Sequence, residues 1–357
     1  MIFYKELFHK IEKILWSVFL KPFFFSIDPE KVHHFVVGAM KLFSPIFYLR
    51  KSFYHFKING KNNPSLEKEV FGIKFPNPVG LAAGFDKNAE VYKQMSSLGF
   101  GFIEIGTVTP VSQDGNPKKR IFRLVNDNAL INRLGFNNDG VDKVVGRLRN
   151  KGNIIIGGNI GKNKVTPNEK AKDDYLICFK ALYDHVDYFA VNVSSPNTPN
   201  LRDLQNINDL REIMYPLISE NNKRDTKPIL IKISPDLNDA DIKKIVDMAL
   251  DLKIDGIITS NTTISRNNLK SKKKLTSETG GLSGEPLKMR STEIIRLIHE
   301  YSNKKLPIIG VGGIMSTQDA LDKLKAGASL IQLYTGFIYN GPSFARNINK
   351  EIIKSLN

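Results

Sequence analysis

The chain has 357 residues, of which 41% are hydrophobic and 25% are charged. These ordinary globular values exclude a mini-protein and a wholly disordered chain, and they leave room for one large domain with an appendage or for two domains. The formal net charge of +16 suggests an anionic partner, such as nucleic acid, an anionic membrane surface or small acidic molecules. Lysine outnumbers arginine, which argues against a dedicated nucleic-acid binder, because bidentate recognition of phosphate favours arginine.

The N-terminal 56 residues differ from the rest of the chain, because they hold 15 of its 34 aromatic residues. Apolar residues from Tyr4 to Phe19 follow helical spacing, which predicts an amphipathic helix that ends at Lys21-Pro22. Asp28-Pro29 then supplies an N-cap and a first-turn proline for a second helix with an apolar stripe over 32–47. We therefore expect a short helical hairpin with Phe23-Phe24-Phe25 in its connecting loop.

Two interpretations of this hairpin stay open. Lys21-Pro22 interrupts its apolar run, which is therefore too short for a transmembrane span. Neither a signal peptide nor an arginine-rich transit peptide fits the sequence. The hairpin could simply pack on its own domain. Alternatively it could lie on a membrane surface, with aromatic side chains at the acyl boundary and lysines at anionic headgroups. Three consecutive phenylalanines beside a turn favour the membrane.

The rest of the chain alternates short apolar strands with helical segments. Near-continuous apolar strands separated by helices indicate buried parallel strands, and eight such units predict a (β/α)8 TIM barrel with the helical hairpin as an N-terminal extension. An open doubly wound sheet is the alternative, but no Gly-x-Gly-x-x-Gly turn follows the first strand. The predicted strands are 78–82, 102–106, 154–159, 188–193, 229–233, 256–260, 308–312 and 330–334. The predicted helices are 88–98, 137–150, 167–184, 203–219, 238–252, 286–302, 316–326 and 342–356.

Two connections between these elements are long. Residues 107–136 resemble an inserted loop or hairpin over the barrel mouth. Residues 261–285 contain four lysines between 270 and 274, which indicates a solvated, mobile loop.

Polar residues follow the predicted strands at the end where barrel enzymes place their chemistry. Each asparagine there offers amide donors and a carbonyl acceptor, which suit a planar heterocycle with N–H and C=O groups. Lys87 and Lys232 could neutralise a carboxylate and stabilise negative charge on a cofactor ring, and Gly312-Gly313 follows a late strand, where barrels often bind phosphate. Singly, each of these residues is more commonly a turn or a cap. The asparagines are Asn132, Asn159, Asn192, Asn197 and Asn261.

The strand ends also lack several common catalytic groups. No histidine and no metal-ligand cluster stands there, which disfavours a metal hydrolase and predicts no metal site. The single cysteine, Cys178, excludes an intrachain disulfide and lies in a predicted helix, where it is poorly placed as a nucleophile. The best candidate for proton transfer is the hydroxyl of Ser195, which needs a water-free environment to act as a base.

Taken in order, these segments resemble dihydroorotate dehydrogenase, and specifically its membrane-associated, quinone-dependent class 2. Ser195 stands where the soluble class carries cysteine, and 27–33 resembles the helical extension of class 2. Asn200 departs from the usual glycine but tolerates left-handed backbone. The matching motifs are Leu81–Lys87, Gly106–Pro110, Asn132–Phe136, Asn159–Lys164, Asn192–Arg202, Lys232–Leu237, Ser260–Thr263, Thr279–Pro286, Ile308–Ile314 and Tyr334–Gly336.

The resemblance implies an FMN enzyme that oxidises dihydroorotate to orotate in pyrimidine synthesis. Ser195 would take the C5 proton while the C6 hydride goes to the flavin. FMN would be bound by Ala83, Gly84, Phe85, Asp86, Lys87, Thr107, Asn159, Asn192, Lys232, Ser260, Gly284, Gly313, Tyr334 and Thr335. The substrate would be bound by Lys87, Asn132, Arg133, Leu134, Gly135, Phe136, Asn192, Asn197, Asn261 and Thr262.

The resemblance also implies different functions for two parts of the chain. Residues 1–56 would form the membrane-associating segment through which a quinone enters, and residues 57–357 the catalytic barrel. The enzyme would lie on the cytoplasmic face of a bacterial inner membrane, with no nucleic-acid partner. Two rivals remain: an FMN barrel that reduces uridines in tRNA, which would use a strand-end cysteine, and a catalytically inactive membrane-surface scaffold.

Overall fold

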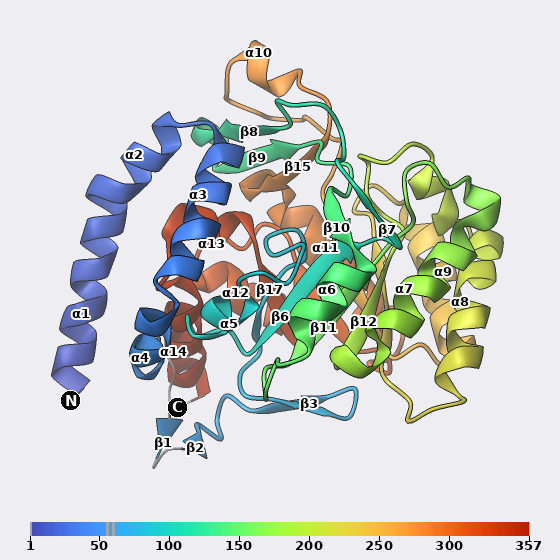
Figure 1. Ribbon diagram of the computed structural model, residues 1–357, viewed down its shortest axis with the longest axis horizontal. Coiled ribbons are helices and arrows are strands. Elements are labelled where there is room, and N and C mark those ends of the chain that lie inside the picture. Colours follow the sequence, from blue (N-terminus) through green and yellow to red (C-terminus); the bar gives the residue numbers. More distant parts are fainter. Residues whose placement is uncertain (1, 55–56, 59–60, 357) are drawn as a thin grey trace.

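The protein was analysed as a computed structural model, which describes residues 2–54, 57–58 and 61–356. Eight parallel strands close into a barrel in chain order, so the predicted TIM barrel is confirmed and the open sheet is wrong (Figure 1). Each strand lies within two residues of its predicted bounds. The strands are β5 (Val79–Leu81), β6 (Phe102–Val108), β11 (Ile156–Ile160), β12 (Tyr188–Asn192), β13 (Ile229–Ile233), β14 (Gly256–Thr259), β16 (Ile308–Val311) and β17 (Leu330–Leu333).

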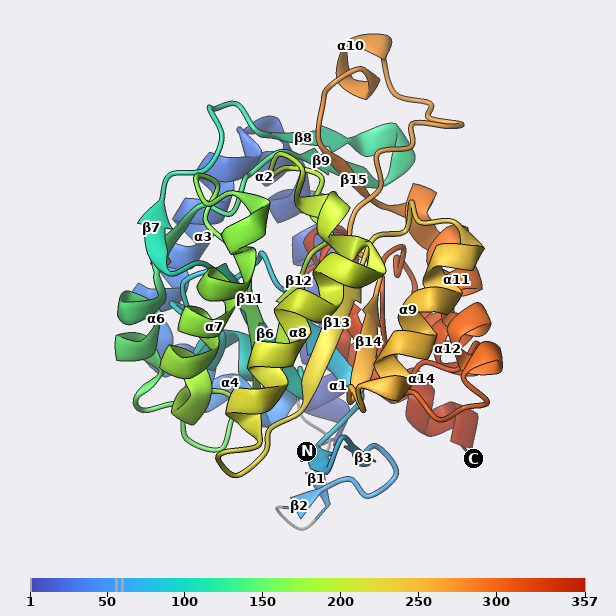
Figure 2. The same cartoon turned by 90° about the vertical axis from the view of Figure 1, so that its right-hand side faces the viewer.

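Helices surround the barrel and bury their apolar faces against it (Figure 2). The predicted helix over 88–98 is shorter, because the carboxylate of Asp86 accepts the backbone N–H groups of Glu90 and Val91 and holds that stretch as a turn. Helix α13 was not predicted, because it lacks a side-chain cap and is rich in aromatic and β-branched residues. The helices are α5 (Tyr92–Ser96), α6 (Val141–Leu148), α7 (Ala171–Leu182), α8 (Ile207–Asn221), α9 (Asp239–Asp251), α11 (Lys288–Tyr301), α12 (Thr317–Lys325), α13 (Thr335–Asn340) and α14 (Phe344–Leu356).

Large aromatic side chains fill the amino-terminal half of the barrel interior. The ring of Phe102 lies against Gly80, where an added Cβ would come within 2.3 Å of it. The hairpin of β3 (Lys68–Val70) and β4 (Ile73–Phe75) closes that end, and Phe75 packs edge-on against Phe102 with ring centroids 5.1 Å apart. Because this end is filled with apolar side chains, polar groups inside the barrel gather toward the carboxyl ends of the strands.

A second, antiparallel sheet covers the carboxyl end of the barrel, in the order β15 (Gly281–Gly284), β9 (Ala129–Asn132) and β8 (Ile121–Leu124) (Figure 1). This confirms the predicted hairpin over the barrel mouth. The loop 107–136 also supplies β7 (Val111–Gln113), which pairs with β10 (Asn138–Gly140).

The lysine-rich connection is more ordered than a solvated loop. It contains the short helix α10 (Lys273–Thr276), and Asp127 accepts the backbone N–H groups of Lys270 and Ser271 at 2.6 and 3.0 Å. Its four lysines are nevertheless exposed, as their charge requires.

The N-terminal helices form the expected antiparallel pair, but two details of the prediction are wrong. Lys21-Pro22 does not end the first helix, because the π-helix continues directly into a helical segment that carries Pro22 in its first turn, a position that tolerates proline. Helical backbone runs on through Phe23, Phe24 and Phe25, so these residues are not in a loop. The segments are α1 (Ile2–Ile14), a π-helix (Leu15–Leu20) and α2 (Lys21–Ser26), then α3 (Pro29–Leu42) and α4 (Ser44–Tyr54).

The turn between the two arms is where the sequence placed it. The side chain of Asp28 accepts the backbone N–H groups of Glu30 and Lys31, both at 3.1 Å, which confirms the N-cap. The proposed domain boundary at residue 56 lies outside the described residues. Beyond it, β1 (Lys57–Ile58) pairs with β2 (Lys61–Asn62).

Specific polar contacts attach this helical pair to the barrel. The buried guanidinium of Arg120 lies 2.7 Å from the carboxylate of Glu30 at the start of α3. The indole N–H of Trp16 donates to the carbonyl of Tyr339 at 3.2 Å. Exposed apolar side chains remain, with Phe19, Phe23 and Phe35 each 60–64% exposed. Among the described residues, no helix has both the length and the apolar character that crossing a membrane requires.

Candidate active site

A polar cavity opens at the carboxyl end of the barrel strands and brings together most of the residues that the sequence singled out. Ser195 lines it together with Lys87 and Lys232. The other predicted residues in its lining are Ala83, Gly84, Thr107, Asn132, Leu134, Gly135, Phe136, Asn192, Asn197, Ser260, Asn261, Thr262, Gly284, Gly313, Tyr334 and Thr335.

Four predicted residues lie outside this lining. Phe85 packs edge-on against His33 of α3, and Arg133 forms an ion pair with Glu278 at 2.6 Å. The carboxylate of Asp86 is engaged by backbone N–H groups, and burial raises its pKa to about 6 despite those hydrogen bonds. Asn159 stands behind Thr107, whose hydroxyl donates to it at 2.5 Å.

The asparagines form two separate hydrogen-bonded groups at the cavity, one of Asn159, Asn192 and Asn261 and one of Asn132 and Asn197. The Asn261 amide donates to Asn192 at 3.3 Å and to Ser194 at 3.0 Å, and Asn192 donates to Thr107 at 2.8 Å. On the opposite wall, Asn197 donates to Asn132 at 3.1 Å. These hydrogen bonds fix the orientation of each amide, and therefore fix which of its donors and acceptors are left for a ligand in the cavity.

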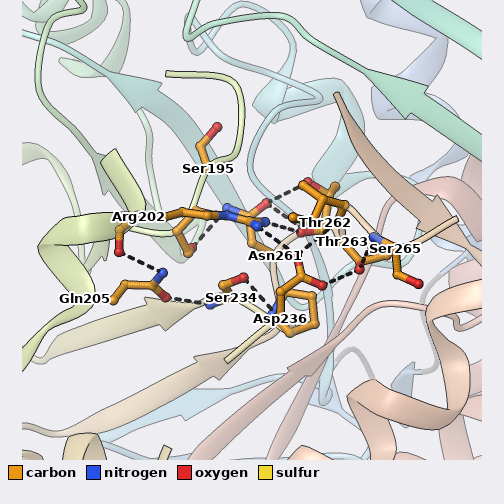
Figure 3. Close-up of polar contacts among 12 residues, drawn as sticks. Ser195, Arg202, Gln205, Ser234, Asp236, Asn261, Thr262, Thr263 and Ser265 are labelled. Atoms are coloured by element: carbon orange, nitrogen blue, oxygen red, sulfur yellow. Dashed lines mark hydrogen bonds and ion pairs between the residues drawn. The ribbon is translucent and has the colours of Figure 1, made fainter. Parts of the chain in front are cut away.

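Ser195 lies on the loop after β12, and its hydroxyl is almost fully buried. Its Oγ accepts the backbone N–H of Asn197 at 3.2 Å, and Figure 3 shows it directed away from the polar cluster around Arg202. Asn200 adopts the left-handed conformation with φ of 55°, which a glycine would normally occupy and which asparagine tolerates.

Arg202 joins three segments around this loop (Figure 3). Its guanidinium donates to the carbonyl of Ser194 at 3.0 Å and to the carbonyl of Thr262 at 2.8 Å, and pairs with Asp236 at 2.7 Å. The Ser195 loop is therefore tied to the ends of β13 and β14.

Lys87 is half-buried at the edge of the cavity. Desolvation, and next the charge of Arg120, lower its pKa to about 8, even though Glu30 and Asp86 act in the opposite direction. A buried ammonium that is weakly compensated by protein groups suits a site that receives an anion.

The chemistry of the lining fits a flavin mononucleotide. The hydroxyl of Ser260 and the side-chain carbonyl of Gln332 are buried without a hydrogen-bond partner, as expected where a polar ligand supplies one. The turn at Gly312 and Gly313 has φ values of 105° and 71°, and a Cβ on Gly313 would come within 2.2 Å of Lys288. Only glycine fits that turn, which leaves its backbone available to a phosphate.

A second cavity of about 560 Å³ lies between the N-terminal helices and the barrel, and its lining is mostly apolar. Its walls include Trp16, Phe24 and Met40, together with His33. Burial first, and then the charge of Lys87, lower the pKa of His33 to about 3, so its imidazole is neutral near pH 7. Five residues line both cavities: Lys87, Asn132, Leu134, Ser283 and Tyr334.

Comparison with known proteins settles the family. A family model described as Dihydroorotate dehydrogenase matches residues 65–356. The chain belongs to the dihydroorotate dehydrogenase family. It is 54% identical to the dihydroorotate dehydrogenase (quinone) of Christiangramia forsetii, over 95% of this chain and 99% of the relative. The corresponding enzyme of Idiomarina loihiensis is 47% identical, over 92% and 98%. A crystal structure of the Eimeria tenella enzyme with ferulenol has a TM-score of 0.81 and 40% identity, covering 92% of each chain.

The chain is therefore an FMN-dependent oxidoreductase that converts dihydroorotate to orotate in pyrimidine biosynthesis and uses a quinone as electron acceptor. Enzymes of this quinone-dependent kind are membrane-associated. This finding sets aside the tRNA-reducing barrel and the inactive scaffold. Within the described residues, no group of His, Cys, Asp and Glu side chains could hold a metal ion.

Sequence reasoning missed several residues that build the site. Glu104 and Gln332 meet in the barrel interior, and Arg202 and Asp236 tie its loops together. The sequence did contain a signal for Glu104 and Gln332, because each stands within an otherwise apolar strand. A buried charged or amide side chain is costly unless it is hydrogen-bonded, so such a residue indicates a polar partner inside the barrel. No such signal marks Arg202, which lies in a short 3-10 helix (Leu201–Gln205).

Lys87 gives a testable pH dependence. Because its pKa is about 8 and an anionic ligand needs the ammonium form, we expect the Kd of orotate to rise about tenfold per pH unit above that value. Titration of the enzyme with orotate between pH 7 and pH 9 measures this rise. Lys87→Met should bind weakly at all pH values, and exposed Lys172→Met should behave as wild type. A wild-type Kd that is constant across this range would contradict the assignment.

Proposed function

We propose that Ser195 is the base of the dihydroorotate oxidation and that the polar cavity binds both FMN and substrate. The observation that carries this proposal is that Ser195, Lys87 and Lys232 face one cavity. FMN would be bound by Ala83, Gly84, Thr107, Asn192, Lys232, Ser260, Gly284, Gly313, Tyr334 and Thr335. The substrate would be bound by Lys87, Asn132, Leu134, Gly135, Phe136, Asn192, Asn197, Asn261 and Thr262. Phe85, Asp86, Asn159 and Arg133 would support these residues from behind.

Each group in the cavity has a task in this scheme. Lys87 pairs with the substrate carboxylate, and the amides of Asn132, Asn197 and Asn261 orient the polar edge of the pyrimidine ring. When bound, FMN supplies the ring that accepts the hydride and passes the electrons on to the quinone. Ser195 Oγ would take the proton from the adjacent carbon while its own hydroxyl proton leaves through a hydrogen-bonding relay. The almost complete burial of Ser195 supports this role, because a hydroxyl competes poorly with bulk water as a base.

We further propose that the quinone enters through the apolar cavity beneath the N-terminal helices. The volume of about 560 Å³ and the apolar walls suit a lipid-soluble acceptor. The five residues that line both cavities support this proposal, because they would bring the acceptor close to the cofactor without opening the polar site to lipid.

The N-terminal segment would be the membrane-contacting part, and the barrel the catalytic part, of the molecule. The helices α1, α2 and α3, which enclose the apolar cavity, also carry exposed apolar side chains that do not line it, among them Leu7, Phe23 and Leu42. Residues 1–55 carry eight Lys or Arg against four Asp or Glu, a balance that suits an anionic surface. We place the enzyme on the cytoplasmic face of a bacterial inner membrane, whose lipids carry negative charge.

Replacement of the proposed base separates cofactor binding from chemistry. Ser195→Ala should retain bound FMN but reduce it with dihydroorotate 10²–10⁴-fold more slowly, which is the range that a positioned base contributes. Stopped-flow absorbance of the bound flavin measures the rate. Ser277→Ala, on the exposed lysine-rich connection, is the control and should react normally. Unchanged flavin reduction in Ser195→Ala would remove this residue as the base.

Vesicle binding tests the membrane proposal. The double variant Phe19→Asp/Phe23→Asp should bind vesicles that contain phosphatidylglycerol at least tenfold more weakly, because it replaces exposed apolar contact area with charge. The control Ile177→Asp changes an exposed apolar residue on α7 and should bind normally. Wild-type binding should also be weaker to neutral vesicles and at high salt. Equal binding to neutral and anionic vesicles would contradict the anionic surface.

A further inference from the structure

A single carboxylate is buried in the barrel interior next to the polar cavity. Glu104 lies on β6, is completely shielded from solvent and faces side chains from four other strands. Its Oε1 accepts from the Asn159 amide at 2.9 Å and lies 3.3 Å from the Lys232 ammonium. Its Oε2 accepts from the Gln332 amide at 2.6 Å and from the Tyr188 hydroxyl at 3.2 Å.

Three of these four partners connect Glu104 with the cavity, two of them directly. Lys232 and Gln332 are part of its lining, and Asn159 continues through Thr107 to Asn192 and then Asn261. Tyr188 contributes on the far side, where the barrel is filled with apolar residues. Burial, and next the neighbouring carboxylate, raise the pKa of Tyr188 well above its usual value, so that its hydroxyl keeps its proton and donates.

The charges at this place have a consequence for any ring bound in the cavity. Lys232 alone would present an unbalanced positive charge to the ligand in a medium of low dielectric constant. Glu104 offsets that charge from behind and also holds the ammonium and two amides in fixed orientations. Reduction adds negative charge to a flavin, so the electrostatic potential at the cavity wall determines how strongly the reduced form is favoured.

We propose that Glu104 is a positioning residue that sets the charge and orientation of the groups facing FMN and thereby lowers the reduction potential of the bound cofactor. This inference rests on the proposed placement of FMN in the polar cavity. Glu104 itself does not line that cavity, and it acts through Lys232, Asn159 and Gln332.

The test is the midpoint potential of the FMN-loaded enzyme, measured by spectroelectrochemical titration at pH 6. Glu104→Gln keeps the shape but removes the charge, so it should favour two-electron reduction at least tenfold, which corresponds to about 30 mV toward positive values. Tyr188→Phe is the matched control, because it removes one hydrogen bond to the same carboxylate without changing the charge, and it should change the equilibrium less than threefold. An unchanged potential in Glu104→Gln would overturn the proposal.

A double variant keeps the test decisive if Glu104→Gln alone does not fold. Lys232→Met should lower the potential. The double variant Lys232→Met/Glu104→Gln removes both charges, so its potential should move back toward that of wild type, by at least a tenfold change in the reduction equilibrium constant. Equal potentials in these two variants would contradict the role of Glu104. The placement of FMN is checked separately with Gly313→Val, which should lose FMN. Retention of FMN by this variant would refute the proposed site, on which the inference rests, whereas loss of FMN here together with an unchanged potential in Glu104→Gln would refute the role of Glu104 alone.

Discussion

The structure depends on keeping two incompatible environments in contact without letting them mix. A polar cavity that suits an anionic pyrimidine and a mostly apolar cavity that suits a quinone share five lining residues. Electron transfer requires the two ligands to approach closely, whereas proton abstraction by a hydroxyl requires the exclusion of water. Lys87 shows this constraint most clearly. It lines both cavities, and its pKa is lowered chiefly by burial, which means that its ammonium is kept away from water.

The fold meets this constraint by filling one end of the barrel and covering the other. Aromatic residues close the amino-terminal end, so the polar residues of the strands meet near the carboxyl ends. The sheet formed by β8, β9 and β15 then covers that end, and the N-terminal helices stand beside the barrel with α3 against β8. The buried Glu30–Arg120 ion pair joins α3 to the start of β8. Because residues of both elements line the apolar cavity, this ion pair fixes two of its walls relative to each other.

Much of this arrangement could be predicted from the sequence. The eight strands are short and almost wholly apolar, so their positions were predicted within two residues, and the polar residues that follow them were expected to meet. Their individual functions followed only from resemblance to a family. The first helix was predicted to end at Lys21-Pro22, but a proline is compatible with the first turn of a new helical segment. The role of Arg202 could not be predicted, because two of its three partners, Asp236 and Thr262, lie 34 and 60 residues away in sequence.

The most direct test of the two-cavity account is to fill the apolar cavity and measure the two half-reactions separately. Val36 on α3 lines that cavity, and Val36→Trp would occupy part of it. The account predicts that stopped-flow reoxidation of the reduced enzyme by a soluble ubiquinone analogue slows at least tenfold, while reduction of the enzyme by dihydroorotate stays within twofold of wild type. Ile177→Trp, on the outer surface of α7, should change neither rate. Unchanged reoxidation in Val36→Trp, or an equal loss in both half-reactions, would contradict the account.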